Sequence, residues 1–597
     1  MTNSFAMKIV LRAVIALSLC LVPTACSLQN EPSTASTKYA ASPCEQTKQS
    51  LVTQDGHQVA YVLSDPNLNR LQEFLHLVLE ANKKEFAGQG SVVRGFGAGS
   101  SYPQIWLRDS ATIIPVARYY YPREYLTSWL EEHLNYQQTD GQLYDWIASG
   151  AAVNFVGGAP LAREVYRSAR RKVADKIITI SADKNTTEAD QESSAVDAAY
   201  QVFKITGDRD WLNKTIRGQS LIERLNLALN YLLTKRFDPR YGLITNAFTA
   251  DWGDVSPVYP DQRAIYLDEK TPTVAGLYTN ALFYRAAKQM EDLNSVVANK
   301  TMAELWKSKA ELIKENMNKN LWQEDKGFYR IHLLLQPKAL SVPPDDSDIF
   351  AMGGNALAVL NGVADDRQAR RIFDVAAQRQ RNFGVSTNAG VLLPPYPAGF
   401  FKHPATSEEY VYQNGGQWDW WAGRFLLAEF ERGYSQRAYQ QVLEIAKKAV
   451  DNDGLYEWHT ITGEGKGSRN YAGSAGVLGG AIFQGLFGVY LSQDSLTLRI
   501  RLAYQSGQIH LYEPATDRYV DYQHCYDKVA NLITVRYASN FPNAGRIHIL
   551  IPNNQRAGEL TFDGNKTDFA TEVIGEDTYV ILDTDWKSHQ LQVRLTN

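Results

Sequence analysis

Cysteine is scarce in this chain of 597 residues, and its four cysteines form no metal-binding or redox motif. Neither CxxC nor HExxH occurs and the 10 histidines are scattered, so we expect no structural zinc site and no zinc protease. Cys20 and Cys26 belong to the N-terminal segment, which leaves Cys44 and Cys525. Because an exported chain meets an oxidising compartment, we predict a disulfide between these two; two unpaired buried thiols are the alternative.

A block of basic residues is also absent. Lys and Arg together number 61 against 65 Asp and Glu, a formal net charge of −4, which gives nucleic-acid binding little electrostatic support. Gly95, Gly97 and Gly99 have neither the spacing nor the preceding strand of a dinucleotide-binding loop. We therefore expect no nucleic-acid partner and no cofactor, and the sequence does not indicate an oligomeric state.

The apolar run after Lys8 and Arg12 is too short to anchor the chain across a membrane. Small residues followed by Cys26 resemble a bacterial lipoprotein processing site, although Pro23 stands where that pattern usually has Leu. We predict an exported protein of the bacterial cell envelope, attached to the membrane only through a lipid on Cys26. A periplasmic or secreted protein without the lipid is the alternative.

The periodicity of apolar residues changes once, near Gln493, from helical spacing to the alternation of strands. From about residue 65 to 492, apolar residues recur at helical spacing, with glycine- and aromatic-rich loops and almost no convincing strand. After that point alternation at period two predicts strands, for example over residues 496–502 and 546–551. The predicted division is a signal segment 1–26, a tether 27–60, a helical catalytic domain 61–493 and a β-rich domain 494–597. Paired helices with functional residues on the longer loops predict a helical ring.

Acidic residues stand beside tryptophan on two distant loops, 251–257 and 453–459. Two separate carboxyl groups among flat aromatic surfaces are what cleavage of a glycosidic bond requires. In the first loop, Pro257 prevents helix continuation and holds Asp254 on the loop. A carboxyl packed on Trp252 is expected to stay protonated, as a general acid must. A helix cap or chain turn is the structural alternative, and Asp251 is the rival acid.

The second loop contains the candidate general base. Glu457 follows a turn and lies between Tyr456 and Trp458. A general base must hold a water molecule, which His459 is placed to orient, unless that histidine binds a sugar hydroxyl. The alternatives are that Glu457 is a surface residue and that Glu464 is the base.

Two further patches are suited to sugar binding. Trp106, Arg108 and Asp109 precede a predicted helix, where an arginine can donate to one hydroxyl and an aspartate accept from its neighbour. Residues 412–421 combine amides with three tryptophans, some of which must belong to the core. The residues expected to bind substrate are Trp106, Arg108, Asp109, Asp251, Trp252, Gln417, Trp418, Asp419 and His459.

In their order, these motifs resemble the six-hairpin glycosidases, nearest to the processing α-glucosidase, amylo-α-1,6-glucosidase and trehalase group. Residues 252–257 resemble the Gly-Met-Asp-Asn-Ser-Pro acid motif and the Trp-Met-Asp-Ala motif of debranching enzymes, which both place the acid at Asp254. Residues 456–465 resemble the Glu-x-Tyr-x-x-x-Thr-Gly region that carries the base. The stretch at Trp106 is similar to one in an exo-mannosidase family, and residues 417–419 resemble a trehalase signature whose following residues differ here.

The resemblance covers about residues 65–490 and implies an (α/α)6 barrel followed by a small β-sandwich-like domain. It also implies an exo-acting, inverting hydrolase that releases a terminal sugar, taken here as α-linked glucose. The alternatives are an exo-mannosidase, a polysaccharide lyase on the same barrel, and a glycan-binding lipoprotein without catalysis. A lyase requires a positively charged cleft beside a uronate, and the mildly acidic composition offers none.

Overall fold

The computed structural model describes residues 59–150, 167–173, 176–336, 340 and 345–596, all within the compact unit Ser42–Asn597. The predicted signal segment, Cys26 and Cys44 lie outside the described residues. Cys525 is disulfide-bonded, and its pairing with Cys44 stays a prediction. Among the described residues, no helix has both the length and the apolar character needed to cross a membrane.

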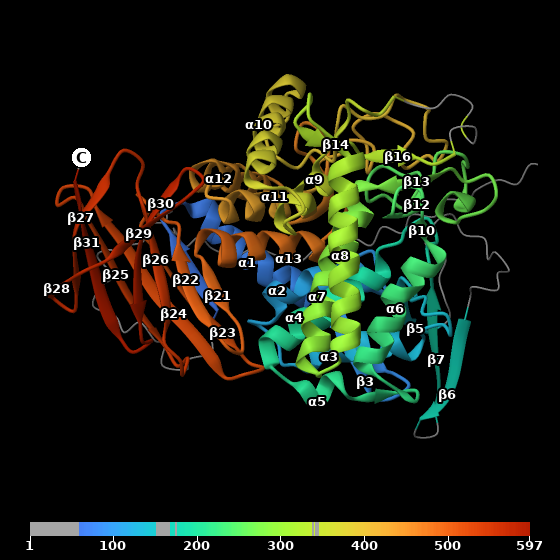
Figure 1. Cartoon of the computed structure of the whole chain (residues 1–597), viewed down its shortest axis with the longest axis horizontal. Helices are drawn as coiled ribbons and strands as arrows, with labels where there is room; N and C mark the ends of the chain where they lie inside the picture. Colours follow the sequence, from blue (N-terminus) through green and yellow to red (C-terminus); the bar gives the residue numbers. More distant parts are fainter. Residues whose placement is uncertain (1–58, 151–166, 174–175, 337–339, 341–344, 597) are drawn as a thin grey trace, which may run out of the picture. The chain divides into compact units, whose positions relative to one another are not determined.

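Six helices in the described part of the chain form a closed inner ring, in which each packs against the next and the last returns to the first. Figure 1 labels these helices. Their order around the ring follows their order in the sequence. The inner helices are α2 (Leu107–Ala117), α4 (Gln191–Thr206), α7 (Leu277–Val296), α9 (Met352–Leu360), α11 (Asp419–Glu431) and α13 (Ala472–Gly480), which continues as a π-helical turn, Ala481–Leu486.

A second set of helices packs outside the ring, and each of them contacts at least one inner helix. The pairing of inner and outer helices makes the fold an α/α barrel. The outer helices are α1 (Pro66–Asn82), α3 (Glu124–Asn135), α6 (Leu221–Lys235), α8 (Lys300–Asn320), α10 (Asp366–Phe383) and α12 (Ser435–Asp451); the short α5 (Arg209–Leu212) precedes α6.

Local sequence sets where these helices begin and end. Asp65 caps α1 by accepting from the backbone N–H groups of Asn67 and Leu68, and Ser220 forms a capping box with Glu223 at the start of α6. Helix α4 ends at Gly207, which takes the left-handed conformation with φ of 66° that favours glycine.

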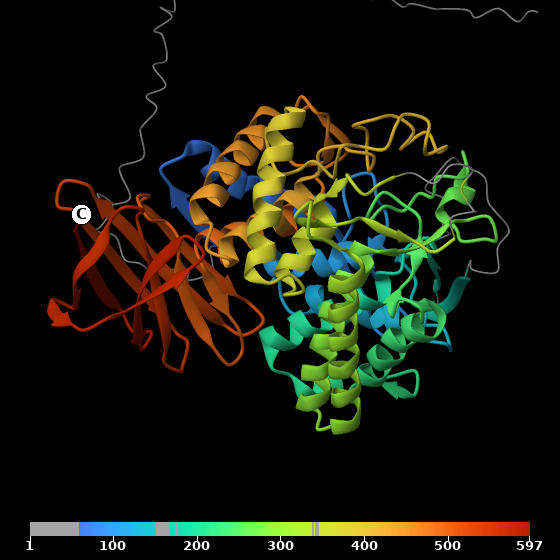
Figure 2. The ribbon, with the colours of Figure 1, turned by 45° about the horizontal axis from the view of Figure 1, so that its top comes forward.

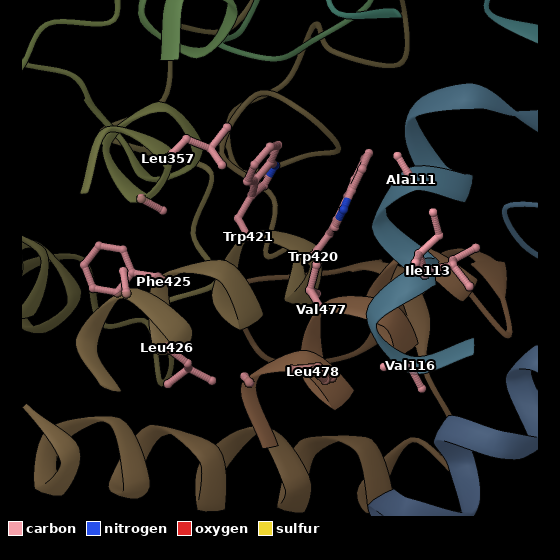
Figure 3. Packing of buried hydrophobic residues seen from close by; sticks show 14 of the residues in the cluster. Ala111, Ile113, Val116, Leu357, Trp420, Trp421, Phe425, Leu426, Val477 and Leu478 are labelled. Carbon is pink, nitrogen blue, oxygen red and sulfur yellow. The ribbon is translucent and has the colours of Figure 1, made fainter. Parts of the chain in front are cut away.

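Aromatic side chains from α11 fill the middle of the ring. Trp420 and Trp421 project from its first turns and stack on each other, with ring centroids 5.4 Å apart (Figure 3). Gly423, on the same helix, lets α13 approach closely, since a Cβ atom there would lie 2.7 Å from the backbone of Val477. These two tryptophans therefore belong to the core.

Short antiparallel pairs occupy the loops between the helices, contrary to the expectation of almost no strand there. Most have only two to five residues per strand, too few for an alternating pattern to be visible in sequence. The pairs and small sheets are β2 (Lys83–Ala87) with β3 (Val92–Phe96); β4 (Ile105–Trp106), β5 (Trp146–Ser149), β7 (Lys176–Asp183) and β6 (Arg167–Val173); β8 (Thr215–Ile216) with β9 (Gln219–Ser220); β10 (Phe237–Asp238) with β11 (Leu243–Ile244); β12 (Asn246–Ala247), β13 (Thr273–Gly276) and β16 (His332–Leu334); β14 (Trp322–Gln323) with β15 (Phe328–Tyr329); β17 (Phe350–Ala351) with β18 (Leu392–Leu393); and β19 (Tyr456–His459) with β20 (Gly465–Arg469).

The C-terminal residues form two sheets, drawn orange to red in Figure 2, as the alternation at period two predicted. Pairing is antiparallel except between β22 and β26. One sheet contains, in order, β21 (Val489–Leu491), β22 (Leu496–Ile500), β26 (Gly545–Ile551), β30 (Asp577–Thr584) and β29 (Ala570–Ile574); the other contains β1 (Ala60–Leu63), β23 (Gly507–Glu513), β24 (Arg518–Asp527), β25 (Leu532–Ser539), β31 (His589–Thr596), β27 (Arg556–Phe562) and β28 (Asn565–Thr567).

Strand β1 belongs to the C-terminal sheet through its pairing, with Ala60 opposite His510. The division of the sequence placed residues 61–63 with the helices instead. Buried polar contacts also join the sheets to the barrel: the Ser435 hydroxyl at the start of α12 donates to Asp577 at 2.5 Å, and Arg118 after α2 donates to Glu513 at 2.6 Å.

Candidate active site

One cavity collects both predicted catalytic carboxyls and most of the predicted sugar-binding residues. Asp254 and Glu457 line it from loops about 200 residues apart in the sequence. The other predicted residues that line it are Trp106, Arg108, Asp109, Trp252 and Trp418.

The carboxylate of Glu457 is held from two sides. It lies on β19, where Glu457 and His459 face inward while Tyr456 and Trp458 are half-exposed. The Tyr102 hydroxyl donates to Oε1 at 2.7 Å, and the backbone N–H of Ser468 donates to Oε2 at 2.8 Å. Burial raises the pKa of Glu457 to about 7, although these two hydrogen bonds act to lower it.

The backbone of Asp254 is fixed by two other segments of the chain. Its N–H donates to Gln413 Oε1 at 3.2 Å, and its carbonyl accepts from Asn185 Nδ2 at 3.2 Å and from the Thr187 hydroxyl at 2.9 Å. Its side-chain Oδ1 is buried and has no hydrogen-bond partner among the described residues. The backbone of Asp254 is therefore held in place, and the residue lines the cavity.

Aromatic rings form much of the cavity wall. Trp252 meets Trp418 edge to face, with ring centroids 4.7 Å apart, and the Trp418 indole donates to the carbonyl of Tyr412 at 3.0 Å. Trp106 lies on another side, 6.1 Å from the ring of Tyr102 and 6.3 Å from that of Trp146. Such faces suit the apolar sides of sugar rings.

Arg108 and Asp109 lie in the first turn of α2. Arg108 Nη1 hydrogen-bonds to Glu188 and, at 3.1 Å, to Asp190, so its charge is neutralised beneath the cavity. Asp109 accepts from the Tyr471 hydroxyl at 3.0 Å, and burial raises its pKa despite the neighbouring arginine. Of this pair, Asp109 is the better placed to bind a sugar hydroxyl.

Four predicted substrate-binding residues do not line the cavity. Asp251 is buried behind it, where Oδ2 accepts from the backbone of Gly354 at 2.8 Å. Asp419 forms a buried ion pair with Lys448 of α12. His459 is fully buried, and burial lowers its pKa to about 4. Gln417 exchanges backbone hydrogen bonds of 2.9 and 2.7 Å with His459.

The prediction that Asp419 lines the same pocket is therefore wrong, because its carboxylate is directed to Lys448 instead. Asp251 does not line the cavity either, which disfavours it as the general acid. The rival base Glu464 is exposed and pairs with Lys466 at 2.6 Å, so it too lies outside the cavity.

Sequence reasoning missed several residues that line the cavity. Asp145 and Trp146 repeat the acid-beside-tryptophan pattern of the two predicted loops and could have been found by it. Burial raises the pKa of Asp145 to about 7, and Arg108 acts to lower it. The other missed residues carried no such signal: Ala98, Tyr102, Asp183, Asn185, Gln262, Ile265, Tyr266 and Tyr471. Tyr412 and Gln413, which belong to the patch 412–421 expected to suit sugar binding, also line the cavity. Among the described residues, no group of three or more His, Cys, Asp and Glu side chains is arranged to hold a metal ion.

The fold of this chain is similar to that of several solved proteins. The α-L-rhamnosidase from Dictyoglumus thermophilum matches with 11% identity and a TM-score of 0.56, over 90% of this chain and 51% of its own. The GH78 family rhamnosidase of Bacillus sp. GL1 matches with 12% identity and a TM-score of 0.52, over 81% of this chain and 41% of its own. This chain thus spans about half, or less, of these two proteins, and identities so low indicate a shared fold alone.

A GH63 mannosylglycerate hydrolase from Thermus thermophilus, solved with Tris, has 16% identity and a TM-score of 0.48, over 68% of this chain and 98% of its own. No curated protein matches. A family model described as the mannosylglycerate hydrolase MGH1-like glycoside hydrolase domain matches residues 102–474. That span is more than half of the chain and contains both Asp254 and Glu457, so the chain belongs to the MGH1-like glycoside hydrolase domain family.

Proposed function

We propose that the protein is an exo-acting, inverting glycoside hydrolase with Asp254 as general acid and Glu457 as general base. Asp254 protonates the glycosidic oxygen as the bond to the leaving group breaks. Glu457 removes a proton from the water molecule that attacks the anomeric carbon from the opposite face. An inverting pair requires the two carboxyls to stand about 6.5–9.5 Å apart so that this water fits between base and sugar.

The observation that carries the proposal is the convergence of these two carboxyls on one aromatic-walled cavity. The side chain of Glu457 is oriented by Tyr102 and Ser468, and that of Asp254 has an oxygen without a protein partner among the described residues. A base with a pKa near 7 is well matched to proton transfer at neutral pH.

For the substrate we propose a terminal α-linked sugar, with glucose as the first candidate because residues 252–257 and 456–465 resemble glucosidase motifs. Mannose is the second candidate, since the family description names a mannosylglycerate hydrolase. Glycerate, the leaving group of such a compound, carries a carboxylate. We further propose export to the bacterial envelope, with a lipid on Cys26 or release without one, on the basis of the N-terminal sequence.

The proposal is tested by hydrolysis of a panel of α-glucosides and α-mannosides with release of the free monosaccharide as the readout. Asp254→Asn and Glu457→Gln should each lower kcat/KM at least ~10²-fold on natural linkages. Glycosyl fluorides need little protonation of the leaving group, so Asp254→Asn should recover much of its activity on them and Glu457→Gln should not.

The reverse pattern on fluorides would exchange the two roles. Hydrolysis of no glycoside by the wild-type protein, together with saturable oligosaccharide binding, would favour the glycan-binding alternative. Release of an unsaturated uronate from a uronate-containing polysaccharide would indicate a lyase. Near wild-type activity in either variant would remove that residue from the mechanism.

A further inference from the structure

A second hollow lies where α12 meets the loops of the C-terminal sheets. It is a groove of about 600 Å³, a size within the range of small-ligand sites. None of the described residues that line it also lines the candidate active site. The lining residues are Ser435, Gln436, Tyr439 and Gln440 of α12, 501–505 after β22, 550–555 at the end of β26, and 576–578 at the start of β30.

The groove lies at the opposite end of α12 from the candidate active site. Ser435, the first residue of the helix, lines the groove. The helix ends at Asp451, shortly before Glu457. At about 1.5 Å per residue, the 17 residues of α12 extend over roughly 25 Å. A sugar bound in the groove is therefore remote from the proposed catalytic carboxyls.

Two tyrosines contribute ring surfaces to this groove. Tyr504 is 47% exposed, yet it is held from two sides. Its hydroxyl donates to the carbonyl of Asn553 at 3.0 Å, and its ring meets that of Tyr526 edge to face, with centroids 5.2 Å apart. Tyr439 of α12 is half-buried. A ring fixed before the ligand arrives loses little freedom on binding, and its open face suits the apolar side of a sugar.

Side-chain amides are the commonest polar groups of the groove. An amide both donates and accepts hydrogen bonds, as a sugar hydroxyl does, so the two match without a net charge. Asn553 Nδ2 donates to Gln436 Oε1 at 2.6 Å, which joins the loop after β26 to α12. Gln440 and Asn554 are exposed. The amide residues are Gln436, Gln440, Gln505, Asn553, Asn554 and Gln555.

The groove offers little to an anionic ligand. Arg501 is the single cationic residue among the described residues that line it; it is buried and donates to the carbonyl of Gln484 at 3.0 Å. Asp577 is buried and accepts from the Ser435 hydroxyl at 2.5 Å. Glu576 is exposed and adds a negative charge. Because an anion removed from water needs a cation or several N–H donors, an uncharged ligand fits this lining better.

We propose that this groove is a second carbohydrate-binding site, which holds a neutral oligosaccharide away from the candidate active site. The Tyr504 ring lies against a sugar face, and the amides bind its hydroxyls. The inference goes beyond the proposed function, because it assigns binding and not catalysis to this part of the molecule. A long glycan held here raises the effective concentration of its ends at the catalytic cavity.

Native electrophoresis of the full-length protein in gels that contain a polysaccharide tests the proposal. The neutral probes are glycogen, an α-glucan, and an α-mannan; polygalacturonate is the anionic comparison. We expect at least one neutral probe to retard the wild-type protein. Tyr504→Ala should weaken this binding at least ~5-fold, since it removes the stacking ring. Tyr504→Phe should keep most of it, because the hydroxyl is already bonded to Asn553.

The matched control is Tyr241→Ala, which removes a half-buried ring from the turn between β10 and β11. It should leave the retardation unchanged. A wild-type protein retarded by neither neutral probe, or more strongly by polygalacturonate, would overturn the inference. Retardation that persists in both Tyr504→Ala and Gln440→Ala would overturn the assignment to this groove. These readouts measure binding, so they are independent of the hydrolysis panel, whose failure would count against the proposed function alone.

Discussion

Tyr102 is the side chain that most directly controls the protonation of the proposed base. Its hydroxyl donates to Glu457 Oε1 at 2.7 Å and acts to lower a pKa that burial has raised to about 7. The base must be ionised to work, so kcat/KM should fall as the pH drops below about 7 in the wild-type protein. The ratio kcat/KM reports the pKa of the free enzyme.

Tyr102→Phe removes this hydrogen bond and should move the acidic limb of the kcat/KM profile to higher pH. A hydrogen bond to a charged group contributes about 1.5–3 kcal/mol, so activity at pH 7 should fall ~10-fold and recover partly at higher pH. Tyr537→Phe, in β25, is the control and should leave the profile unchanged. A uniform loss at every pH would show that Tyr102 has only a structural role.

The sequence predicted Asp254 and Glu457 because each is an acid close to tryptophan between predicted helices, and both line the cavity, although Glu457 lies on strand β19 and not on a loop. Their roles as acid and base stay predictions. The same signal was misleading for Asp419, which also lies beside tryptophan but forms an ion pair with Lys448. Adjacency in sequence does not say which way a side chain points once a helix has begun. Tyr102 gave no signal, since its contact with Glu457 is made across the fold.

At the scale of elements, α11 carries an unusual buried charge. Glu429 is fully buried, and neither of its carboxyl oxygens has a hydrogen-bond partner among the described residues. Burial raises its pKa to about 8, with Arg437 acting to lower it. Between about pH 4.5 and 8 the native state therefore binds more protons at this site than the unfolded chain does, and the free energy of unfolding falls as pH rises.

Glu429→Gln keeps the shape of the side chain and removes its ionisation. The variant should unfold at a higher temperature than wild type at pH 8, with a gain of several kcal/mol at most, since one pKa unit is about 1.4 kcal/mol. The difference should shrink as the pH falls towards 4.5 and below, because the carboxyl of the unfolded wild-type chain then also becomes protonated. Thermal unfolding at the two pH values measures it, and a variant less stable than wild type at pH 8 would contradict the assignment.

Helical periodicity is absent from the sequence of one inner helix. Helix α9 reads Met-Gly-Gly-Asn-Ala-Leu-Ala-Val-Leu, and eight of its nine residues are buried. A helix enclosed by its neighbours has no polar face, so the usual alternation of faces is missing from its sequence. The two-residue strands of the loops were missed because pairing over so short a stretch leaves no pattern.

At the scale of the whole molecule, the closed ring explains how distant loops build one site. Helices α2 and α13 come from opposite ends of the matched region and pack against each other, which brings Asp109 to within 3.0 Å of the Tyr471 hydroxyl. The family match supports a six-hairpin glycosidase. The closer resemblance to processing α-glucosidases, amylo-α-1,6-glucosidases and trehalases stays a prediction.

Stereochemistry tests the central claim most directly, because an acid and a base acting on opposite faces of the sugar permit a single outcome. Proton NMR of the sugar released first from an α-linked substrate, recorded before mutarotation, should show the β-anomer. Asp254→Asn and Glu457→Gln should release neither anomer at a comparable rate. Initial release of the α-anomer would contradict the account, since it requires a covalent intermediate and a nucleophile where we place a base.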